Sequence, residues 1–560
     1  MRRKRLYISH SAQSLPTSMA SHHANAVYQL FMDATTTPLA PWQWLLLLVV
    51  ACVLLLLTSS RRRPLRRSSN DKARRQLPPS PPGALPIIGH LLLVGDRPHV
   101  SFRDLAAKHD DRGLMLVRLG TVPNLVVSSA RAAEAILRTH DHVFASRPAS
   151  ALFDDLVYGS SNVAFAPYGE HWRQVRKLVT AHLLTVKKVN SYHHARQEEV
   201  CLVLDKLREA ATMDAEVDLS EMMNAFANDI ICRAVCGKFS REEGRNRLFR
   251  ELNHTTTLLV AGFDLESYFP GLARSLGRLF VSNRKVQQAH RRWDDLLEEI
   301  ISDHERRRRT SKNGHGESGD DEQDQSTADF TDVMLSVQRE YGITRDHIKA
   351  ILMDMFEAGT ATSSSVLEAA MAELMRSPHL MAKLQAEVRK KTPMGQEMVR
   401  EEDLSGMPYL RAVVKETLRV HPPVPLLVPH QSMADCDVDG YTIPAGTRVI
   451  INAWAISRDP RSWGKPEEFV PERFMDGGAA ADVDFRGNDF QFTPFGAGRR
   501  MCPGINFGLA TIYIMLANLV YCFDWKLPAG VEKEDIDMME VFGLTVHRKD
   551  KLVLVPRPHV

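Results

Sequence analysis

Hydrophobic positions along the chain form three kinds of pattern. From Trp42 to Thr58 the residues are almost all apolar, a stretch at the short end of what a bilayer-spanning helix needs. Short apolar runs at Leu114–Leu119 and Asn124–Ser128, and again within Asp437–Ile451 and near Val541–Val555, are typical of β-strands. Elsewhere apolar residues mostly recur at helical spacing. The pattern predicts a mainly α fold: one large helical domain with small peripheral β-sheets, behind an N-terminal transmembrane helix.

The second half of the chain contains long helical patterns. The segment Arg345–Arg376 follows Thr344, a good N-cap residue, and ends before Pro378, which disfavours helix in the residue before it. The apolar stretch Ile505–Phe523 is also predicted to be helical. By contrast, Arg306–Gln325 is charged, contains glycine and is poor in apolar residues, so we expect an exposed loop there.

The N-terminal region divides by composition. Residues 1–41 form an extension, 42–58 the predicted transmembrane anchor, 59–90 a basic flank and proline-rich hinge, and 91–560 the large domain. The first 31 residues are basic, rich in serine and free of acids, which is compatible with an organelle transit peptide. We favour the hypothesis that translation starts at Met32, because an apolar anchor directly behind a transit peptide is unusual.

Five arginines follow the anchor: Arg61, Arg62, Arg63, Arg66 and Arg67. Because basic flanks stay on the cytosolic side of a membrane, they predict that the large domain faces the cytosol. A cleaved signal peptide is the competing interpretation. It is disfavoured because no small-x-small cleavage site follows the apolar run and the arginines lie on its C-terminal side.

Charge and cysteine content argue against nucleic-acid binding, a disulfide scaffold and a zinc site. Residues 1–75 carry a net charge of +10 and the rest of the chain −7, so the positive charge belongs beside a membrane and the large domain is not expected to bind nucleic acid. Seven scattered cysteines argue against a disulfide scaffold and favour a reducing compartment. Cys232 and Cys236 have no second pair nearby, so we expect buried, apolar-like residues rather than zinc ligands.

The strongest chemical signal is the ten-residue segment FGAGRRMCPG at 495–504. It has the form F-x-x-G-x-R-x-C-x-G, with Phe495, Gly498, Arg500, Cys502 and Gly504 at the fixed positions. The two glycines allow a tight turn and close approach to a flat ligand. A proline, tolerated at a first helical position, and then an apolar helix follow the cysteine. We therefore expect the helix N-terminus to lower the thiol pKa and to stabilise a thiolate.

This segment resembles the haem-binding loop of the cytochrome P-450 family, and the resemblance covers residues 77–557. It implies haem b as the cofactor and Cys502 as the metal ligand, because a thiolate ligand pushes electron density onto haem iron and favours O–O cleavage. Trp172 and Arg176 match the family's W-x-x-x-R helix. The resemblance implies that they and Arg500 hold the haem propionates, within a cofactor site that includes Phe495, Gly498 and Gly504.

Two further segments match family motifs in the expected order. Glu416 and Arg419 form an E-x-x-R pair on one face of a helix, and Arg473 lies in the segment PERF. The resemblance implies a buried charge network of these three residues, which is costly to desolvate unless its hydrogen bonds are all made. We expect a structural role for it, without a part in the chemistry.

The helix Arg345–Arg376 corresponds to the family helix that crosses the distal haem face, and its middle reads AGTATS. Thr362 matches the threonine that hydrogen-bonds oxygen and steers proton delivery. Gly359, Ala361 and Ser363 belong to the same catalytic segment. A glycine and clustered hydroxyls weaken the backbone ladder there and make room for oxygen and water.

One position departs from the family pattern. An acid usually precedes the threonine, and here the residue is Ala361. Reductive oxygen activation needs two protons, so water, Ser363 or a substrate hydroxyl or N–H would have to supply them. An isomerase or dehydratase cycle without oxygen activation is the alternative. A non-enzymatic membrane protein with a decayed haem fold is disfavoured because every haem-contacting motif position is present.

The substrate pocket is placed by the same resemblance. It implies lining from the loop Ala151–Ser161, from the distal helix, from Val424–Leu427 and from Phe542–Thr545. The individual residues predicted to line it are Phe356, Ala358, Val424, Leu426, Leu427, Phe542 and Leu544. Nearly all are apolar or small, which suits a neutral, compact and hydrophobic substrate.

The amino-acid sequences of these motifs are similar to those of plant A-type microsomal enzymes. The segments at 116–123, 138–148 and 163–170 are similar to the grass monooxygenases that hydroxylate indole and indolinones in benzoxazinoid biosynthesis. This resemblance implies insertion of one atom of O2 into a small hydrophobic plant metabolite, with terpenoids or aldoximes as alternatives to indoles.

Electrons have to come from another protein, because the chain has no glycine fingerprint for a flavin or nicotinamide cofactor. The expected donor is a membrane-bound NADPH flavoprotein reductase, with Arg499 and Arg500 as candidate docking residues. The expected location is the endoplasmic reticulum membrane, with a single span and a cytosolic catalytic domain.

Overall fold

The computed structural model describes residues 76–110, 112–237, 244–261, 265–273, 284–314 and 328–559. The predicted extension, anchor and arginine flank lie outside the described residues. The residues from Gln76 onward form one compact unit, so residues 76–90 of the predicted hinge belong to it. Leu116 donates a backbone hydrogen bond to Pro79, and His90 donates one to Arg118, which ties this segment to the first strand of the chain.

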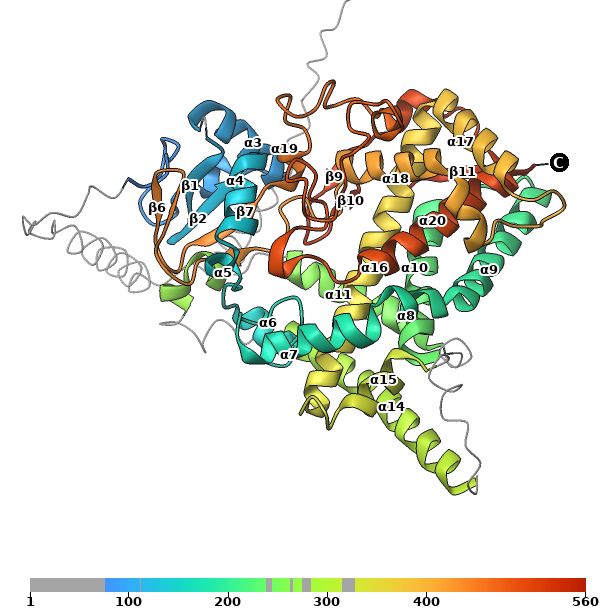
Figure 1. Ribbon diagram of the computed structural model, residues 1–560, viewed down its shortest axis with the longest axis horizontal. Coiled ribbons are helices and arrows are strands. Elements are labelled where there is room, and N and C mark those ends of the chain that lie inside the picture. The colour runs from blue at the N-terminus through green and yellow to red at the C-terminus, as the bar shows by residue number, and fades with distance from the viewer. Residues whose placement is uncertain are drawn as a thin grey trace, which may run out of the picture. The chain divides into compact units, whose positions relative to one another are not determined.

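Helices make up most of the unit (Figure 1). The α-helices are α3 (Pro98–His109), α4 (Ala130–Glu134), α5 (Asp141–Phe144), α6 (Ala151–Leu156), α7 (Glu170–Leu178), α8 (Val186–Ser191), α9 (His193–Thr212), α10 (Leu219–Cys236), α11 (Arg245–Ala261), α12 (Leu265–Tyr268), α14 (Arg284–Gly314), α15 (Phe330–Val337), α16 (Arg345–Arg376), α17 (Pro378–Lys391), α18 (Pro408–Val420), α19 (Ala453–Ile456) and α20 (Ile505–Cys522). Short 3-10 or π-helical turns are η1 (Leu91–Leu93), η2 (Ala135–Thr139), η3 (Val179–Leu183), η6 (Glu401–Gly406), η7 (Pro471–Phe474), η8 (Gly498–Arg500) and η9 (Lys533–Asp535).

The strands form small sheets at the periphery, as the pattern predicted. The strands are β1 (Leu114–Leu119), β2 (Val122–Val127), β3 (Val217–Asp218), β4 (His430–Gln431), β5 (Cys436–Val438), β6 (Tyr441–Ile443), β7 (Arg448–Ile451), β8 (Phe523–Lys526), β9 (Glu540–Val541), β10 (His547–Arg548) and β11 (Val553–Pro558). The largest sheet has the order β1-β2-β7-β4, with β2 and β7 parallel and the other pairs antiparallel. β11 joins β3 and β8, while β5–β6 and β9–β10 are two-stranded.

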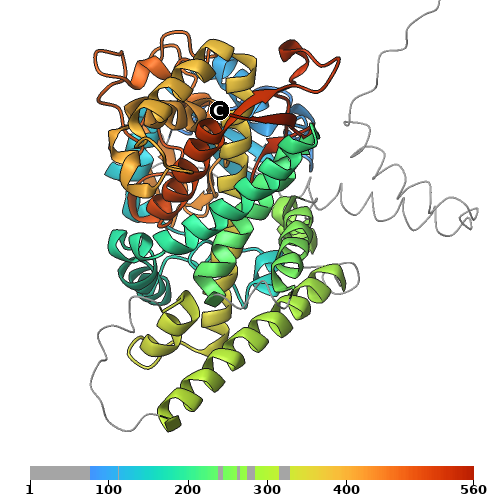
Figure 2. The ribbon, with the colours of Figure 1, turned by 90° about the vertical axis from the view of Figure 1, so that its right-hand side faces the viewer.

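The helix α16 runs through the middle of the helical part and packs against α10, α20, α18 and α14 (Figures 1 and 2). Its predicted limits are confirmed. The Thr344 hydroxyl accepts a hydrogen bond from the His347 N–H, and the His347 ring nitrogen accepts one from the Thr344 N–H, a capping box that satisfies the first turn. Most of the helix is buried because apolar residues occur around its whole circumference.

The predicted loop Arg306–Gln325 is wrong in its first part. The helix α14 continues to Gly314, so residues 306–314 are helical, and residues 315–325 lie outside the described residues. The cause is that arginine is a good helix former and that α14 has already been nucleated over twenty residues upstream. Arg306 also pairs with Asp303, three positions earlier, at 3.1 Å. In Figure 2 this helix forms one outer edge of the unit.

Two apolar features have ordinary core roles. Cys232 and Cys236 are both buried in α10, and burial raises the pKa of the Cys232 thiol. In the part of the chain that the structure describes, α20 is the one helix long and apolar enough to cross a membrane, and 67% of that stretch is buried inside the fold. It packs against α16, α9 and α17.

Candidate active site

A cavity opens between the middle of α16 and the loop that precedes α20. Cys502 borders it on one side, and Ala358, Gly359 and Thr362 of α16 border it on the other. The space not filled by protein atoms, including its opening to solvent, is about 1530 Å³. Its lining is mostly apolar, with a thiol on one side and a few buried polar groups, the composition of a small-molecule site.

The loop 495–502 presents the thiol of Cys502 to the cavity. Its ends are joined by a hydrogen bond from the Cys502 N–H to the Phe495 carbonyl at 2.9 Å. Gly498 has φ +67°, and a Cβ there would lie 2.2 Å from the Leu137 carbonyl oxygen, so only glycine fits this turn. Gly504, with φ −88°, has an ordinary backbone conformation and serves as the N-cap of α20.

The Cys502 thiol lies just before α20, whose N-cap N–H acts on it as we expected, but burial acts in the opposite direction and is the larger effect. Burial raises the pKa of Cys502, and the Gly504 N–H and the Arg176 charge oppose this rise without cancelling it. The helix begins at Ile505, so Pro503 precedes the N-cap instead of occupying the first helical position. The Gly504 N–H, at the N-cap, is the helix-end group that acts on the thiol.

A cation cluster of three arginines borders the same cavity, beside one histidine that burial keeps neutral. Arg147, Arg176, Arg500 and His430 all line it, and no acid forms an ion pair with any of the three arginines among the described residues. Burial lowers the pKa of each arginine, and the pKa of His430 falls to about 3 because burial and two neighbouring arginines oppose its protonation. Uncompensated buried cations favour an anionic ligand.

The tryptophan of the W-x-x-x-R helix borders the cavity and also supports a neighbouring arginine. Trp172 donates its indole N–H to the Val163 carbonyl at 3.1 Å, and its ring lies under the Arg500 guanidinium, 4.1 Å from the ring centre. Arg176 borders the cavity and donates to the Met501 carbonyl at 2.5 Å. Trp172 therefore supports Arg500 by a cation–π contact, while Arg176 faces the anion position.

The distal segment of α16 is an uninterrupted helix, in contrast to the weakened ladder we expected. Gly359 allows close packing instead, because a Cβ there would lie 2.3 Å from Cδ1 of Ile231 on α10. The Thr362 hydroxyl donates to the Ala358 carbonyl at 2.7 Å. Ser363 is buried beside Gly508 of α20, and Ala361 is half-buried next to them.

The structure brings some predicted pocket residues to the cavity and not others. Ala358, Val424 and Leu427 line it. Phe356 does not, because it is fully buried and stacks on Phe249 of α11 with ring centres 3.7 Å apart. Leu426 packs against the core beside the largest sheet.

The region around β9 and β10 was also predicted wrongly. Phe542 stacks on His99, with ring centres 5.8 Å apart, and Leu544 lies in the turn between the two strands. Neither borders the cavity. The loop Ala151–Ser161 does not border it either, because α14 holds that loop through a hydrogen bond between the His290 ring and the Leu156 carbonyl.

The E-x-x-R pair and the PERF arginine meet in one buried cluster. Arg419 donates to both carboxylate oxygens of Glu416 at 2.8 and 2.9 Å, and Arg473 donates to the same carboxylate at 3.0 Å. The remaining arginine N–H groups bind backbone carbonyls of the segment 457–468. The cluster does not border the cavity, so it supports the fold beside the site without contacting a reactant.

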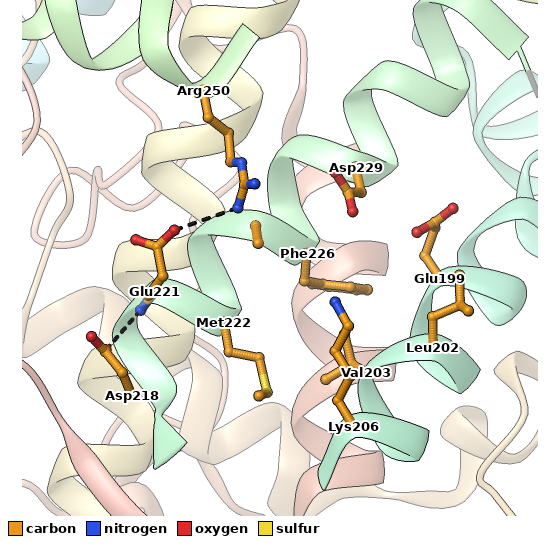
Figure 3. Close-up of a pocket in the computed structure, with 11 residues that line it drawn as sticks. Glu199, Leu202, Val203, Lys206, Asp218, Glu221, Met222, Phe226, Asp229 and Arg250 are labelled. Atoms are coloured by element: carbon orange, nitrogen blue, oxygen red, sulfur yellow. Dashed lines mark hydrogen bonds and ion pairs between the residues drawn. The ribbon is translucent and has the colours of Figure 1, made fainter. Parts of the chain in front are cut away.

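A second hollow lies between α9 and α10 (Figure 3). One ion pair lies in it, Arg250 with Glu221 at 3.4 Å, and the Asp218 carboxylate accepts the Glu221 backbone N–H at 3.0 Å. Phe226 and Met222 form an apolar floor. No thiol or buried cation cluster borders it, so we place the candidate active site in the first cavity.

The first cavity fits an iron porphyrin on its own geometry, with a thiol for the metal and three buried guanidinium groups for two carboxylates. The family model described as "Cytochrome P450" matches residues 78–555. The chain belongs to the cytochrome P450 family. It is therefore an oxidoreductase, a monooxygenase that uses haem b and O2, with NADPH electrons supplied through a reductase.

Similar proteins include three from Zea mays. Indole-2-monooxygenase is 56% identical over 86% of this chain and 88% of its own length. 3-Hydroxyindolin-2-one monooxygenase is 52% identical and indolin-2-one monooxygenase is 53% identical, each over 86% of this chain and 89% of its own length. A zebra fish cytochrome P450 structure with abiraterone aligns with a TM-score of 0.66 and 24% identity over 83% of this chain and 100% of its own, which shows the shared fold.

Three cavity residues of this P450 were missed by sequence reasoning. Arg147 belongs to the cation cluster, His430 lies beside that cluster, and Asp354 is a buried acid on α16. A cation inside an otherwise apolar segment was the available signal for Arg147, which precedes Pro148, and for His430, which follows Pro429. Their convergence was invisible, because more than 280 residues separate them in the chain.

Proposed function

We propose that this P450 inserts one oxygen atom of O2 into indole or an indolinone. The balanced reaction takes the substrate, O2, NADPH and a proton to the hydroxylated product, water and NADP⁺. The observation that supports this most directly is 52–56% identity over 86% of the chain to maize enzymes named for indole and indolinone oxidation. A mostly apolar cavity lining suits such a compact, neutral substrate.

We assign the cofactor contacts residue by residue. Cys502 would ligate the haem iron, while Arg176, Arg500 and Arg147 would face the propionates, with Trp172 holding Arg500 in place. Phe495, Gly498 and Gly504 would shape the loop under the porphyrin. When bound, the haem supplies a redox-active iron whose thiolate ligand favours O–O cleavage.

We infer that Thr362 orients a proton-carrying water. A threonine hydroxyl has a single O–H donor, and here that hydrogen is used on the Ala358 carbonyl. The lone pairs of Oγ1 are then available to accept from a water in the cavity. Because Ala361 carries no acid, a water held by Thr362 would take over proton delivery, while Gly359 allows α16 to pack closely on α10.

We propose that the electron donor is a membrane-bound NADPH flavoprotein reductase. Arg499, within the loop 495–502, is half-exposed, and it also pairs with Asp141 at 2.9 Å. Arg500 is buried and is assigned to the haem instead of the docking surface. We further propose one transmembrane segment at 42–58 in the endoplasmic reticulum membrane, with the catalytic unit in the cytosol.

The deciding experiment uses microsomes that contain this chain and a plant reductase. Indole and indolin-2-one are supplied with ¹⁸O2 and NADPH, and product mass is measured. We expect a hydroxylated product carrying one ¹⁸O atom. Product without label, or product formed without NADPH, would replace the proposal with the isomerase or dehydratase cycle that Ala361 suggested. No product from either indole, in a sample with the thiolate-type carbonyl spectrum, would overturn the substrate and redirect the search to terpenoids and aldoximes.

A further inference from the structure

Asp354 is an acid on α16 whose side chain borders the active-site cavity although only 8% of the residue is exposed. It lies eight positions before Thr362, which corresponds to about 12 Å along the helix axis. It is therefore remote from the distal threonine but belongs to the same wall of the cavity. No lysine or arginine of the described chain forms an ion pair with it.

The carboxylate of Asp354 binds one short segment across the cavity, Asn162–Ala166, which we name the cap segment. One oxygen accepts the Asn162 side-chain amide at 2.5 Å, and the other accepts the backbone N–H groups of Val163 at 2.7 Å and Ala164 at 3.2 Å. Asn162 in turn accepts the Phe165 N–H at 3.0 Å. Four donors of the cap segment thus depend, directly or through Asn162, on a single carboxylate.

The carbonyl groups of the cap segment accept hydrogen bonds from arginines of the cation cluster. Val163 accepts from Trp172 and Arg500, and Ala166 accepts from Arg500 at 2.6 Å. Arg147 donates to the Ala164 carbonyl at 3.0 Å. The segment is therefore held with its N–H groups toward an anion and its carbonyls toward the cation cluster, so its peptide dipoles are aligned between the two.

Burial of an acid without an ion pair is expensive, and burial raises the pKa of Asp354 to about 7 while its three hydrogen bonds hold it down. Hydrogen bonds to a charged group are stronger than those between neutral groups. The cost is consistent with a function in ordering the cap segment, two of whose residues, Val163 and Ala164, line the cavity directly.

We propose that Asp354 is a positioning residue that holds the cap segment across the cavity and thereby sets the space available to the substrate. The substrate part rests on the proposed function, whereas the anchoring of the cap segment does not. The carboxylate acts through Val163 and Ala164, whose side chains border the space, and takes no part in the chemistry.

The test compares Asp354→Asn with Glu357→Gln in the haem-loaded full chain in lipid nanodiscs. Glu357 is the matched control, because it is another buried acid of α16 with a raised pKa, about 8, but its hydrogen-bond partner is Thr256 of α11. Hydrogen–deuterium exchange is followed in peptides that cover the cap segment. Spectral titration with indole and steady-state kinetics follow on the same samples, with the carbonyl spectrum as the check on haem ligation.

In Asp354→Asn we expect exchange of the Val163 and Ala164 amides to accelerate on the order of tenfold or more, indole binding to weaken, and KM to rise more than kcat falls. Glu357→Gln should leave these amides protected. If Asp354→Asn does not fold, Asn162→Ala, which removes one of the three donors to the Asp354 carboxylate, should accelerate exchange of the Val163 and Ala164 amides as well, and unchanged exchange of these two amides would overturn the proposal.

Unchanged exchange in the Asp354→Asn cap segment would overturn the proposal. A fall in kcat with a larger solvent isotope effect, at unaltered exchange and indole affinity, would overturn it too, because it would assign Asp354 to proton delivery. If wild-type protein does not bind indole at all, the proposed function fails, and the exchange measurement still decides the anchoring role.

Discussion

At the scale of single residues, the site depends on one thiol, Cys502, and one hydroxyl, Thr362, each with defined contacts. Cys502 is the one cysteine of the described chain that borders the cavity, while Cys232, Cys236 and Cys436 are buried in the core. Thr362 has one hydrogen-bond donor, already used on the helix backbone. Replacing Cys502 should therefore remove the iron ligand alone, and replacing Thr362 should remove one hydroxyl group from the cavity.

Replacing Cys502 by alanine should abolish the red-shifted Soret band of the reduced carbonyl complex, because no other thiol of the described residues borders the cavity. The measurement is the carbonyl difference spectrum of purified protein. Cys522→Ser, at the far end of α20, serves as the control and should retain the band. A normal band in the Cys502→Ala protein would refute the ligand assignment.

Replacing Thr362 by alanine removes the acceptor for the proton-carrying water. The fraction of consumed NADPH that appears as product should fall severalfold, and the missing electrons should appear as hydrogen peroxide. Thr362→Ser keeps the hydroxyl and should preserve most of the coupling. Equal coupling in wild type and Thr362→Ala would mean that protons reach oxygen by another route.

At the scale of elements, buried charge clusters join helices to loops. The Glu416 cluster joins α18 to η7 and to the carbonyl groups of the segment 457–468. A second cluster places His421, at the end of α18, between Glu373 of α16 and Glu540 of β9 at 2.8 and 3.2 Å. These clusters fix the positions of elements that have little secondary structure of their own.

Glu416→Gln should destabilise the protein by about 3–5 kcal/mol, because it leaves two buried arginines without their anion. The measurement is chemical unfolding of haem-loaded protein. Glu472→Gln is the matched control: Glu472 lies beside Arg473, but its pairing with Lys383 is exposed, so a loss under about 1 kcal/mol is expected. Similar losses for both variants would contradict the assigned role of the buried cluster.

The His421 cluster predicts a pH dependence of stability. The two carboxylates raise the pKa of His421 above its ordinary value of 6.5. A raised pKa in the folded state means that the stabilisation is complete below the unfolded pKa and is lost as pH rises through the folded pKa. The pKa values of Glu373 and Glu540 are lowered, so their contribution is lost at the acidic end.

Thermal melting of wild type and His421→Asn should therefore differ most near pH 6 and converge as pH rises above the raised pKa. The difference between the two proteins is the quantity to plot, because other titrating groups cancel in it. A constant difference from pH 6 to pH 9 would show that His421 does not titrate in this range.

At the scale of the whole molecule, function depends on delivering electrons from a separate reductase to a buried site. The compact unit begins at Gln76, close behind the predicted basic flank. A cytosolic catalytic unit on a single anchor predicts that protease added to sealed microsomes digests the unit while a short N-terminal fragment stays protected. Protection of the whole unit would invert the proposed topology.

Native peptides from residues 1–31 would exclude a start at Met32.

The sequence by itself determined features whose signals lie within one or two turns. Thr344 and Pro378 delimit α16, and the spacing of Phe495, Gly498 and Cys502 specifies the thiol loop, because caps, prolines and tight turns act on neighbouring residues. The mainly helical fold with small sheets followed from periodicity in the same way. These predictions needed no knowledge of distant contacts.

Only the tertiary structure decided which side of each element meets the cavity. Phe356 packs against α11, whereas Ala358 borders the cavity. The helix α16 is buried on nearly all sides, so its hydrophobic pattern does not show which residues meet the cavity and which meet a neighbouring helix. Asp354 and the cap segment are about 190 residues apart, so their hydrogen bonds exist only once the chain has folded. The chemistry was readable locally, while the shape of the pocket was a property of long-range packing.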